Sequence, residues 1–407
     1  MERTKVAVIG AGQAGLSASY HLAHHEVDHV VLERNRVADS WHRGRWDSFR
    51  LVTQNWQWRL LGPPQLAAEP EAFMTRADVI GGLEQLAGAL DTPLRTGVTI
   101  SSVEPGSPHG FQIETSAGAL AADAVVVATG TYHHAAIPAL AGRLDPSIQQ
   151  LHSSAYRNPA ALPPAAVLVV GSGQSGWQIA REIHQAGRQV HWSLGRASRL
   201  PRRYRGRDIF RWMKELGLLD LPMGDHPAGP RIRHEPKPFI CPSPSDEPED
   251  PRRLAQEGLV LHGRLESVNA GKARFGGDMR RNLREADDAC LGMATLIDTF
   301  IEHSSATASP PAKLITHFDP PEPARDLNLR GEGIGTIIWA TGYRSDWQSW
   351  LKAGAFDRRG YPLQDRGVSP HLGLYFAGLD WMHTWGSGLL YGVADDAAHV
   401  VEQLLSA

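Results

Sequence analysis

Short apolar runs, each closed by a glycine or another turn residue, recur along this chain. Val6–Ile9 ends at Gly10, a helical pattern follows to His24, and Val30–Leu32 forms the next run. Short apolar runs bounded by turn residues are typical of buried strands, whereas apolar positions at helical spacing are typical of an amphipathic helix. The beginning of the chain therefore predicts a strand, a tight turn, a helix and a second strand.

The same arrangement returns in the middle of the chain. Val167–Val170 ends at Gly171, a helical pattern runs to Ala186, and Gln189–Trp192 is the partner strand. Further apolar runs are Ala124–Val127, Ile337–Trp339 and Leu374–Phe376. In both strand–helix–strand units a glycine-rich turn joins the first strand to the helix. We therefore predict an α/β fold with two Rossmann-like dinucleotide-binding domains.

Two proline-rich segments interrupt this pattern, over residues 226–251 and 304–323. Long irregular segments in compact domains usually serve as lids, binding loops or linkers. Between them, apolar positions from Leu283 to Phe300 predict an amphipathic core helix, and a last helix is predicted to begin near Ser387–Gly388 and Leu389.

The first glycine turn has the spacing Gly10-x-Gly12-x-x-Gly15. In dinucleotide-binding loops the first glycine allows the tight turn, the second lets a pyrophosphate approach the backbone, and the third lets helix and strand pack closely. The following helix presents free N–H groups to the phosphates. Glu33, at the end of the partner strand, is placed to accept hydrogen bonds from ribose hydroxyls and would repel a 2′-phosphate. An ordinary glycine turn in an α/β domain is the alternative interpretation.

The second turn, Gly171-x-Gly173-x-x-Gly176, repeats this spacing, but no carboxylate follows its partner strand. Ser193 and Arg196 stand there instead, where a guanidinium can hold the 2′-phosphate of NADP. More arginines follow, and a solvated basic face is the alternative reading of them: Arg199, Arg202, Arg203, Arg205 and Arg207. A carboxylate in one unit and arginines in the other imply two different dinucleotides, FAD in the first and NADPH in the second.

With these motifs the chain resembles the flavin-containing monooxygenases (class B flavoprotein monooxygenases) and their bacterial relatives, which have a glutathione-reductase-like architecture. The resemblance rests also on Ala128-Thr129-Gly130, Ala340-Thr341-Gly342-Tyr343, the segments 373–378 and 40–48, and Asp380. It implies that Asp380 contacts the ribityl-diphosphate arm of FAD and that the segment 40–48 lies along the isoalloxazine. It also implies a FAD-binding domain over 1–158 and 341–407, with an NADPH-binding domain over 159–340 inserted between its parts. Besides the residues named above, the expected cofactor contacts are Gln13, Ala14, Arg34, Trp41, Trp46, Val98, Gln174 and Ser175.

One family fingerprint, FxGxxxHxxxW, is half present. His152 and Tyr156 match its second half, with Tyr for Trp, whereas Pro146 and Ile148 occupy the positions of Phe and Gly. His152 is therefore either a hinge or nicotinamide-side residue, as the resemblance suggests, or a surface histidine. The missing half leaves the oxygenation subclass open.

The chemistry implied by the resemblance is reduction of FAD by NADPH, followed by oxygenation of a small organic substrate, at nitrogen or sulfur, through a flavin C4a-(hydro)peroxide. Such a site must exclude water, and two groups of tryptophans could wall it if they converge: Trp41, Trp46, Trp56 and Trp58, and Trp381 and Trp385. The candidate catalytic residues are Asn55, His383 and Thr384. An NADPH oxidase that releases hydrogen peroxide, or a flavin-bearing binding protein without catalysis, are the alternatives.

Composition excludes several other classes. The 407 residues carry Lys+Arg 41 against Asp+Glu 44, a net charge of −3, which argues against a nucleic-acid binder. The two cysteines, Cys241 and Cys290, are too far apart in sequence for a redox pair and too few for a disulfide framework. We find no metal-ligand spacing, no apolar stretch long enough for a membrane and no signal peptide, so a cytoplasmic location is expected. The expected partners are a small-molecule substrate and dioxygen, with homodimer formation left open.

Overall fold

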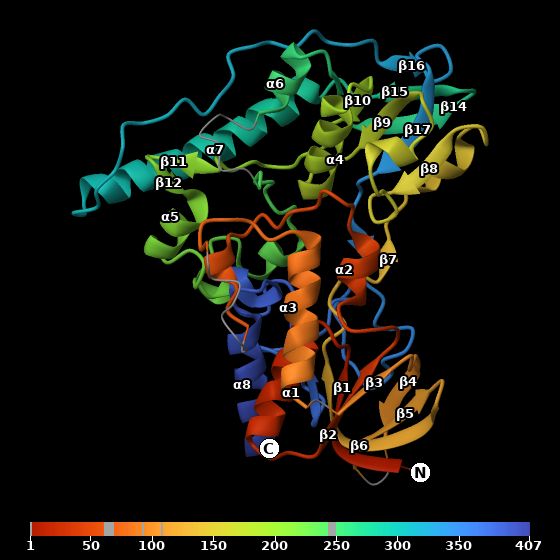
Figure 1. Ribbon diagram of the computed structural model, residues 1–407, viewed down its shortest axis with the longest axis vertical. Helices are drawn as coiled ribbons and strands as arrows, with labels where there is room; N and C mark the ends of the chain where they lie inside the picture. The colour runs from red at the N-terminus through yellow and green to blue at the C-terminus, as the bar shows by residue number, and fades with distance from the viewer. Residues whose placement is uncertain (1, 61–68, 92, 107–108, 243–249) are drawn as a thin grey trace.

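The computed structural model describes residues 2–60, 69–91, 93–106, 109–242 and 250–407, and it divides into two stacked units (Figure 1). The lower unit in Figure 1 contains the first sheet, with strand order β3-β2-β1-β6-β5-β4 and β19 paired to β6. Its strands are β1 (Glu2–Ile9), β2 (His29–Glu33), β3 (Leu94–Thr96), β4 (Ile100–Pro105), β5 (Phe111–Thr115), β6 (Gly118–Val127) and β19 (Leu374–Phe376). The helices α1 (Gln13–His24), α2 (Asp39–Gly44), α3 (Arg76–Ala89) and α8 (Val393–Ser406) belong to this unit.

The upper unit contains a parallel sheet in the order β13-β10-β9-β17-β8. Its strands are β8 (Gln149–His152), β9 (Ala166–Val170), β10 (Val190–Ser193), β13 (Val260–His262) and β17 (Ile334–Trp339). The helices here are α4 (Gln174–Gln185), α5 (Ile209–Glu215), α6 (Pro251–Gln256) and α7 (Met279–Glu302). An antiparallel sheet of β14 (Leu265–Asn269), β15 (Lys272–Phe275) and β16 (Asp326–Asn328) and the hairpin of β11 (Arg203–Tyr204) and β12 (Arg207–Asp208) complete it.

The predicted pair of strand–helix–strand units is confirmed, because β1–α1–β2 and β9–α4–β10 each form with parallel pairing between their strands. The amphipathic helix expected over 283–300 forms as α7, with Leu283, Cys290 and Ile297 buried. The last helix begins later than expected. A 3₁₀ helix, η7, occupies Trp385–Gly388, and α8 starts only at Val393, so the proposed helix N-terminus at 387–388 is wrong.

Two short linkers join the units. β7 (His134–Ala135) leaves the first unit and pairs antiparallel with β18 (Tyr343–Arg344), which returns to it. Because β8 pairs with β17, the second sheet already begins at Gln149, earlier than the boundary predicted at residue 158. The reason is local: the sequence of β8 shows little alternation of apolar and polar residues and has no continuous apolar run. It therefore does not predict a buried strand.

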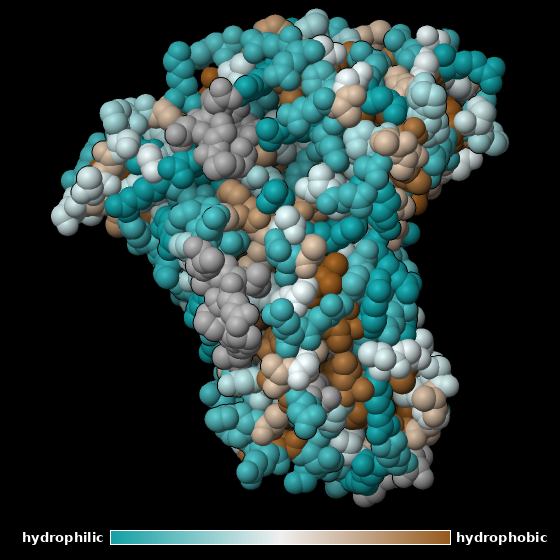
Figure 2. Space-filling model, viewed as in Figure 1, coloured by the Kyte–Doolittle hydropathy of each residue, from teal (hydrophilic) through white to brown (hydrophobic). Residues whose placement is uncertain are grey.

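The buried residues bind the two units together. One continuous cluster includes Val8 and Leu16 of the first unit and Val169 and Trp177 of the second. Figure 2 shows a mostly hydrophilic outer surface, with apolar side chains gathered in a strip over the lower unit. The remaining 3₁₀ turns are η1 (Asn55–Gln57), η3 (Ala139–Arg143), η4 (Pro159–Ala161), η5 (Met223–Asp225) and η6 (Gly229–His234).

Candidate functional site

The first glycine loop has the geometry of a phosphate cradle. Gly10 has φ +109° and a Cβ there would lie 2.7 Å from the carbonyl oxygen of Ala128, so only glycine fits the turn. Gly15 packs so tightly against the backbone of Gly10 that a side chain would collide with it. A Cβ on Gly12, by contrast, would meet nothing within 4 Å. The loop is therefore closed on its inner side and open above Gly12, where a pyrophosphate would approach.

Glu33 lies at the edge of this loop. Its Oε2 accepts a hydrogen bond from the Ala11 N–H (2.9 Å), and its Oε1 accepts one from the Asn35 N–H (2.9 Å). A carboxylate has about four lone-pair sites, so both oxygens keep acceptor capacity for hydroxyls. Val98 is buried beside it and donates its N–H to the Glu33 carbonyl (3.0 Å), whereas Arg34 is exposed.

The C-terminal segment returns to the first loop. Gln13, at the start of α1, donates from Nε2 to the Gly388 carbonyl (2.9 Å), and Gly378 packs against Ala14. The Asp380 carboxylate lies directly against Gly388. The tertiary structure thus places Asp380 near the first glycine loop, and its contact with the ribityl-diphosphate arm of FAD stays a prediction.

The second glycine loop repeats the same geometry. Gly171 has φ +115° and packs on the Ala340 carbonyl, Gly176 packs on Gly171, and Gly173 faces open space. Gln174, at the start of α4, accepts a hydrogen bond at Oε1 from the Ile240 N–H (2.9 Å), while its buried Nε2 has no hydrogen-bond partner among the described residues. Ser175, the next residue of α4, is half-buried.

Of the arginines after β10, one is exposed and the others form ion pairs or hydrogen bonds within the protein. Arg199 and Arg202 are buried, paired with Asp287 (2.8 Å) and Asp208 respectively. Arg205 pairs with Asp298 (2.7 Å), Arg207 pairs with Glu215 (2.6 Å), and Arg203 donates to the Gly206 carbonyl (2.8 Å). A solvated basic face is therefore wrong for Arg199 and Arg202. Arg196 is exposed, and in the described part of the chain it has no ion pair.

Ser193 does not join Arg196. It is buried, its Oγ donates to the Gly263 carbonyl (2.9 Å) and accepts from the Leu265 N–H (3.0 Å). Both contacts hold β10 to the start of β14, so the proposed phosphate contact of Ser193 is not supported. The cause is tertiary: the residues that follow β13 supply both hydrogen-bond partners of the hydroxyl.

His152 is buried at the crossing of the linkers. Its Nδ1 accepts from the Ser154 N–H (3.2 Å), so Nε2 carries the proton and donates to the Gly342 carbonyl (2.9 Å). Burial lowers the pKa of His152, which keeps the imidazole neutral. The ring packs edge-on against Tyr343, which stacks on Tyr132 with centroids 4.7 Å apart. Its burial excludes a surface histidine, and the role as a hinge or nicotinamide-side residue stays a prediction.

The tryptophans form two separate groups. Trp41 and Trp46 both pack edge-on against Phe49 in the core shared by the two units, and the Arg45 guanidinium lies 5.0 Å from the Trp41 ring centroid. Trp56 and Trp385 belong instead to a second cluster, around Tyr391. Trp381 packs edge-on against Trp385, with centroids 5.6 Å apart. The structure thus places Trp56 in the same cluster as Trp385. It leaves Trp41 and Trp46 in the other cluster, so the two predicted groups do not converge as wholes.

The candidate catalytic residues flank this second cluster. Asn55 donates from Nδ2 to the Glu69 carbonyl (2.9 Å), and its buried Oδ1 is without a partner among the described residues. Thr384 caps η7 by accepting from the Gly386 N–H (3.2 Å). The His383 carbonyl accepts from the Met223 N–H (2.7 Å). Asn55 thus keeps a free acceptor, while the hydroxyl of Thr384 has a structural use.

Sequence reasoning missed Lys237 and Tyr132. Lys237, in the proline-rich segment, forms an ion pair with Asp380 (Nζ to Oδ1, 2.6 Å). The negative charge of Asp380 raises the pKa of Tyr132. A signal existed for Tyr132, which follows the triplet 128–130 much as Tyr343 follows 340–342. No local pattern marks Lys237.

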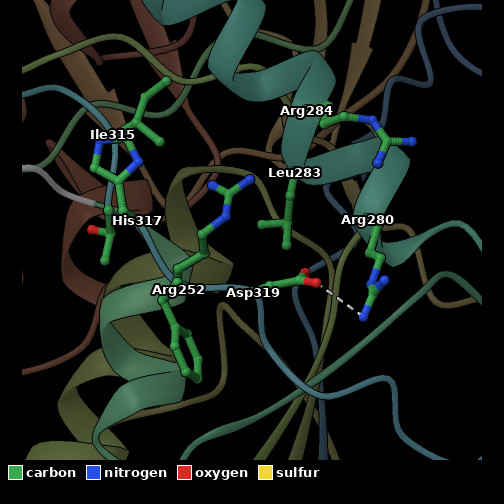
Figure 3. Close-up of a pocket in the computed structure, with 9 residues that line it drawn as sticks. Arg252, Arg280, Leu283, Arg284, Ile315, His317 and Asp319 are labelled. Carbon is green, nitrogen blue, oxygen red and sulfur yellow. Dashed lines mark ion pairs between the residues drawn. The ribbon is translucent and has the colours of Figure 1, made fainter.

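A cavity of about 500 Å³ lies elsewhere, between α6, α7 and residues 315–319 (Figure 3). Arg252, Arg280 and Arg284 line it together with His317, and Arg280 pairs with Asp319 (3.2 Å). Its lining includes none of the predicted cofactor residues. No cluster of metal-ligating side chains occurs among residues that the structure describes. Within the same ranges, every helix is too short or too polar to traverse a bilayer.

Comparisons with known proteins agree with this geometry. Residues 7–207 match the Pyridine nucleotide-disulphide oxidoreductase family. The chain is 31% identical over 405 residues to an uncharacterized CzcO-like oxidoreductase of Geobacillus kaustophilus (strain HTA426), covering 98% of both chains. It is 25% identical over 415 residues to the indole-3-pyruvate monooxygenase YUCCA1 of Oryza sativa subsp. japonica, covering 98% of this chain and 90% of that one. The structure resembles that of a flavin-containing monooxygenase from Stenotrophomonas maltophilia, with a TM-score of 0.67, 20% identity and coverage of 100% and 99%.

Proposed function

This chain belongs to the family of the CzcO-like oxidoreductases, and we propose that it is an NADPH-dependent flavin monooxygenase that oxygenates a small organic substrate at nitrogen or sulfur. The family and the two-dinucleotide fold make it a flavin-dependent oxidoreductase of the monooxygenase type, with FAD and NADPH as its cofactors. The preference for NADPH over NADH and the oxygenation target are the parts that we propose.

The first loop fits FAD. The space above Gly12 admits a pyrophosphate, Glu33 retains acceptor capacity for ribose hydroxyls, and Asp380 lies beside the loop. Bound FAD supplies the two-electron chemistry and the activation of dioxygen. The chain's own residues bind and orient it.

The observation that carries the NADPH assignment is the contrast between Glu33 and Arg196. Glu33 is the last residue of β2 and Arg196 lies in the loop that follows β10, but one is a carboxylate held against its glycine loop and the other is an exposed guanidinium. Arg199, Arg202, Arg205 and Arg207 are all paired with carboxylates of the fold. Arg196 is therefore the cation that can hold a 2′-phosphate there.

Apolar side chains support oxygenation, because an oxygenating site has to exclude water. Trp381 is buried, Trp385 packs against it, and Trp56 joins the same cluster through Tyr391. Asn55 borders this wall with a buried acceptor, Oδ1, and we propose that it orients the substrate. Nitrogen or sulfur is the proposed target because the half-present fingerprint, with Pro146 and Ile148, disfavours oxygenation of a carbonyl.

The test is turnover under ¹⁸O₂ with a panel of amines and sulfides. We expect consumption of NADPH in preference to NADH, and a product that carries one ¹⁸O atom for each NADPH oxidised. Hydrogen peroxide equal to the NADPH consumed, with no labelled product from any substrate, would indicate an oxidase. A yellow protein that consumes neither nucleotide would indicate a flavin-bearing binding protein.

A further inference from the structure

Residues 222–241, which include the first part of the longer proline-rich segment, form a strap that is anchored on the loop after β19. The Met223 N–H donates to the His383 carbonyl (2.7 Å). Arg233 Nε donates to the Trp381 carbonyl (3.1 Å), and the His226 ring packs edge-on against Trp381. One end of the strap is therefore held by backbone groups of the first unit.

The strap then reaches Asp380 from two sides. Lys237 Nζ lies 2.6 Å from Asp380 Oδ1. The Arg233 guanidinium lies 4.8 Å from the ring centroid of Tyr361, whose hydroxyl donates to the Asp380 carbonyl (3.1 Å). Burial lowers the pKa of Lys237, but the charges of Asp380 and Tyr132 outweigh it and raise the pKa overall, so the ammonium stays charged at neutral pH.

Asp380 in turn is linked to the first glycine loop. Its carboxylate lies against Gly388, and the Gly388 carbonyl accepts a hydrogen bond from Gln13, the first residue of α1. Lys237 therefore acts on a carboxylate that is linked to the first glycine loop through one intervening residue, Gly388.

The other end of the strap touches the second glycine loop. The Ile240 N–H donates to Oε1 of Gln174, the first residue of α4 (2.9 Å), and Phe239 stacks on Trp177 with centroids 4.9 Å apart. The Nε2 of Gln174 stays buried and unpartnered among the described residues. The short stretch 237–240 thus contacts the second loop directly at Gln174 and is linked to the first loop through Asp380 and Gly388.

We propose that Lys237 is a positioning residue for FAD: it holds the Asp380 carboxylate in place at the first loop, and through residues 237–240 it makes FAD binding and NADPH binding interdependent. The inference rests on the proposed function only for the identity of the two cofactors. Loss of the ammonium leaves Asp380 without its cation and releases the strap between the loops.

The experiment measures the dissociation constant of FAD by dilution of the full-length holoenzyme, followed by flavin fluorescence, with and without NADP⁺. The variants are Lys237→Met, Lys237→Arg and, as matched control, Arg231→Met. Arg231 is an exposed cation of the same strap whose Nε contacts only the Ala228 carbonyl among the described residues. Because the Lys237–Asp380 pair is partly exposed, we expect Lys237→Met to weaken FAD binding about fivefold. Lys237→Arg should restore it to within about twofold, and Arg231→Met should leave it unchanged.

A double-mutant cycle separates positioning from general stability. Asp380→Asn alone should also weaken FAD binding, and adding Lys237→Met to it should weaken binding little further, because both changes break the same interaction.

NADP⁺ should tighten FAD binding in the wild type and lose this effect in Lys237→Met, since coupling between two ligands is reciprocal. Trypsin gives an independent readout: cleavage after Arg231 and Arg233 should be faster in Lys237→Met.

Unchanged FAD affinity and unchanged cleavage in Lys237→Met would overturn the inference, as would additive losses in the double mutant. These outcomes are distinct from failure of the proposed function. A fivefold loss of FAD affinity in an enzyme that releases only peroxide overturns oxygenation and leaves the role of Lys237 standing. Normal oxygenation with unaltered FAD binding in Lys237→Met overturns the role of Lys237 alone.

Discussion

The Nδ1 atom of His191 lies 2.9 Å from the Nε2 atom of His262, across the pairing of β10 with β13. Both rings are buried, and His262 also stacks on Phe275 with centroids 4.2 Å apart. Burial, with the neighbouring His191 adding to it, lowers the pKa of His262 to about 3, and burial lowers the pKa of His191 as well. The folded protein therefore holds both imidazoles neutral inside the second unit.

This pair should make the fold acid-sensitive. Below the ordinary histidine pKa of about 6.5 the unfolded chain binds protons that the folded chain does not, so stability falls as the pH drops from there toward 3. Each such proton lowers the free energy of unfolding by about 1.4 kcal/mol per pH unit. Thermal unfolding midpoints at pH 5 and pH 7 test this. The loss on acidification should be smaller in His262→Gln, while the exposed His303→Gln should behave as wild type.

Arg196→Ala should raise the KM for NADPH by roughly tenfold to a hundredfold, because a guanidinium–phosphate contact contributes about 1.5–3 kcal/mol. The KM for NADH should change little, since that nucleotide has no 2′-phosphate. Steady-state kinetics with both nucleotides measures the ratio. Arg330→Ala, an exposed arginine far along the chain, is the control. An unaltered preference in Arg196→Ala would reject the phosphate contact.

Gly12→Val and Gly15→Val should fail in different ways. A side chain on Gly12 projects into open space, so the Gly12→Val protein should fold but retain no FAD. Its unfolding midpoint should equal that of the wild-type protein stripped of flavin. A side chain on Gly15 collides with the Gly10 backbone and should destabilise the fold itself. Flavin absorbance of the purified proteins and circular dichroism distinguish the two. A Gly12→Val protein fully loaded with FAD would mean that the first loop does not hold the pyrophosphate.

Asp287→Asn should destabilise the second unit. Asp287 accepts hydrogen bonds from Arg199 (2.8 Å) and Arg252 (2.7 Å), and all three side chains are largely buried. Removing the negative charge leaves two buried guanidinium groups whose other carboxylate partner, among the residues that the structure describes, is Asp250, and the expected loss is about 3 kcal/mol. Urea unfolding provides the measurement. The exposed neighbour Asp288→Asn should stay within about 0.5 kcal/mol of wild type.

The local sequence determined much of this protein. The glycine spacing, the strands before each loop and the contrast of Glu33 with Arg196 follow from backbone geometry within a few residues, because a turn with positive φ at Gly10 and Gly171 needs glycine wherever the rest of the chain lies. The amphipathic pattern of α7 is local in the same way, and for that reason the sequence predicts this helix.

Only the tertiary structure decided which side chains from distant segments of the chain contact one another. Arg199 and Arg196 are both arginines in one run, yet one is buried against Asp287 and the other is exposed, because α7 covers one position and leaves the other free. Lys237 meets Asp380 across 143 residues of chain, and the hydroxyl of the buried Ser193 is bonded to Gly263 and Leu265. Periodicity and spacing describe how each segment folds, whereas the partners of a buried charge depend on how separate segments pack, and that packing is set by the whole core.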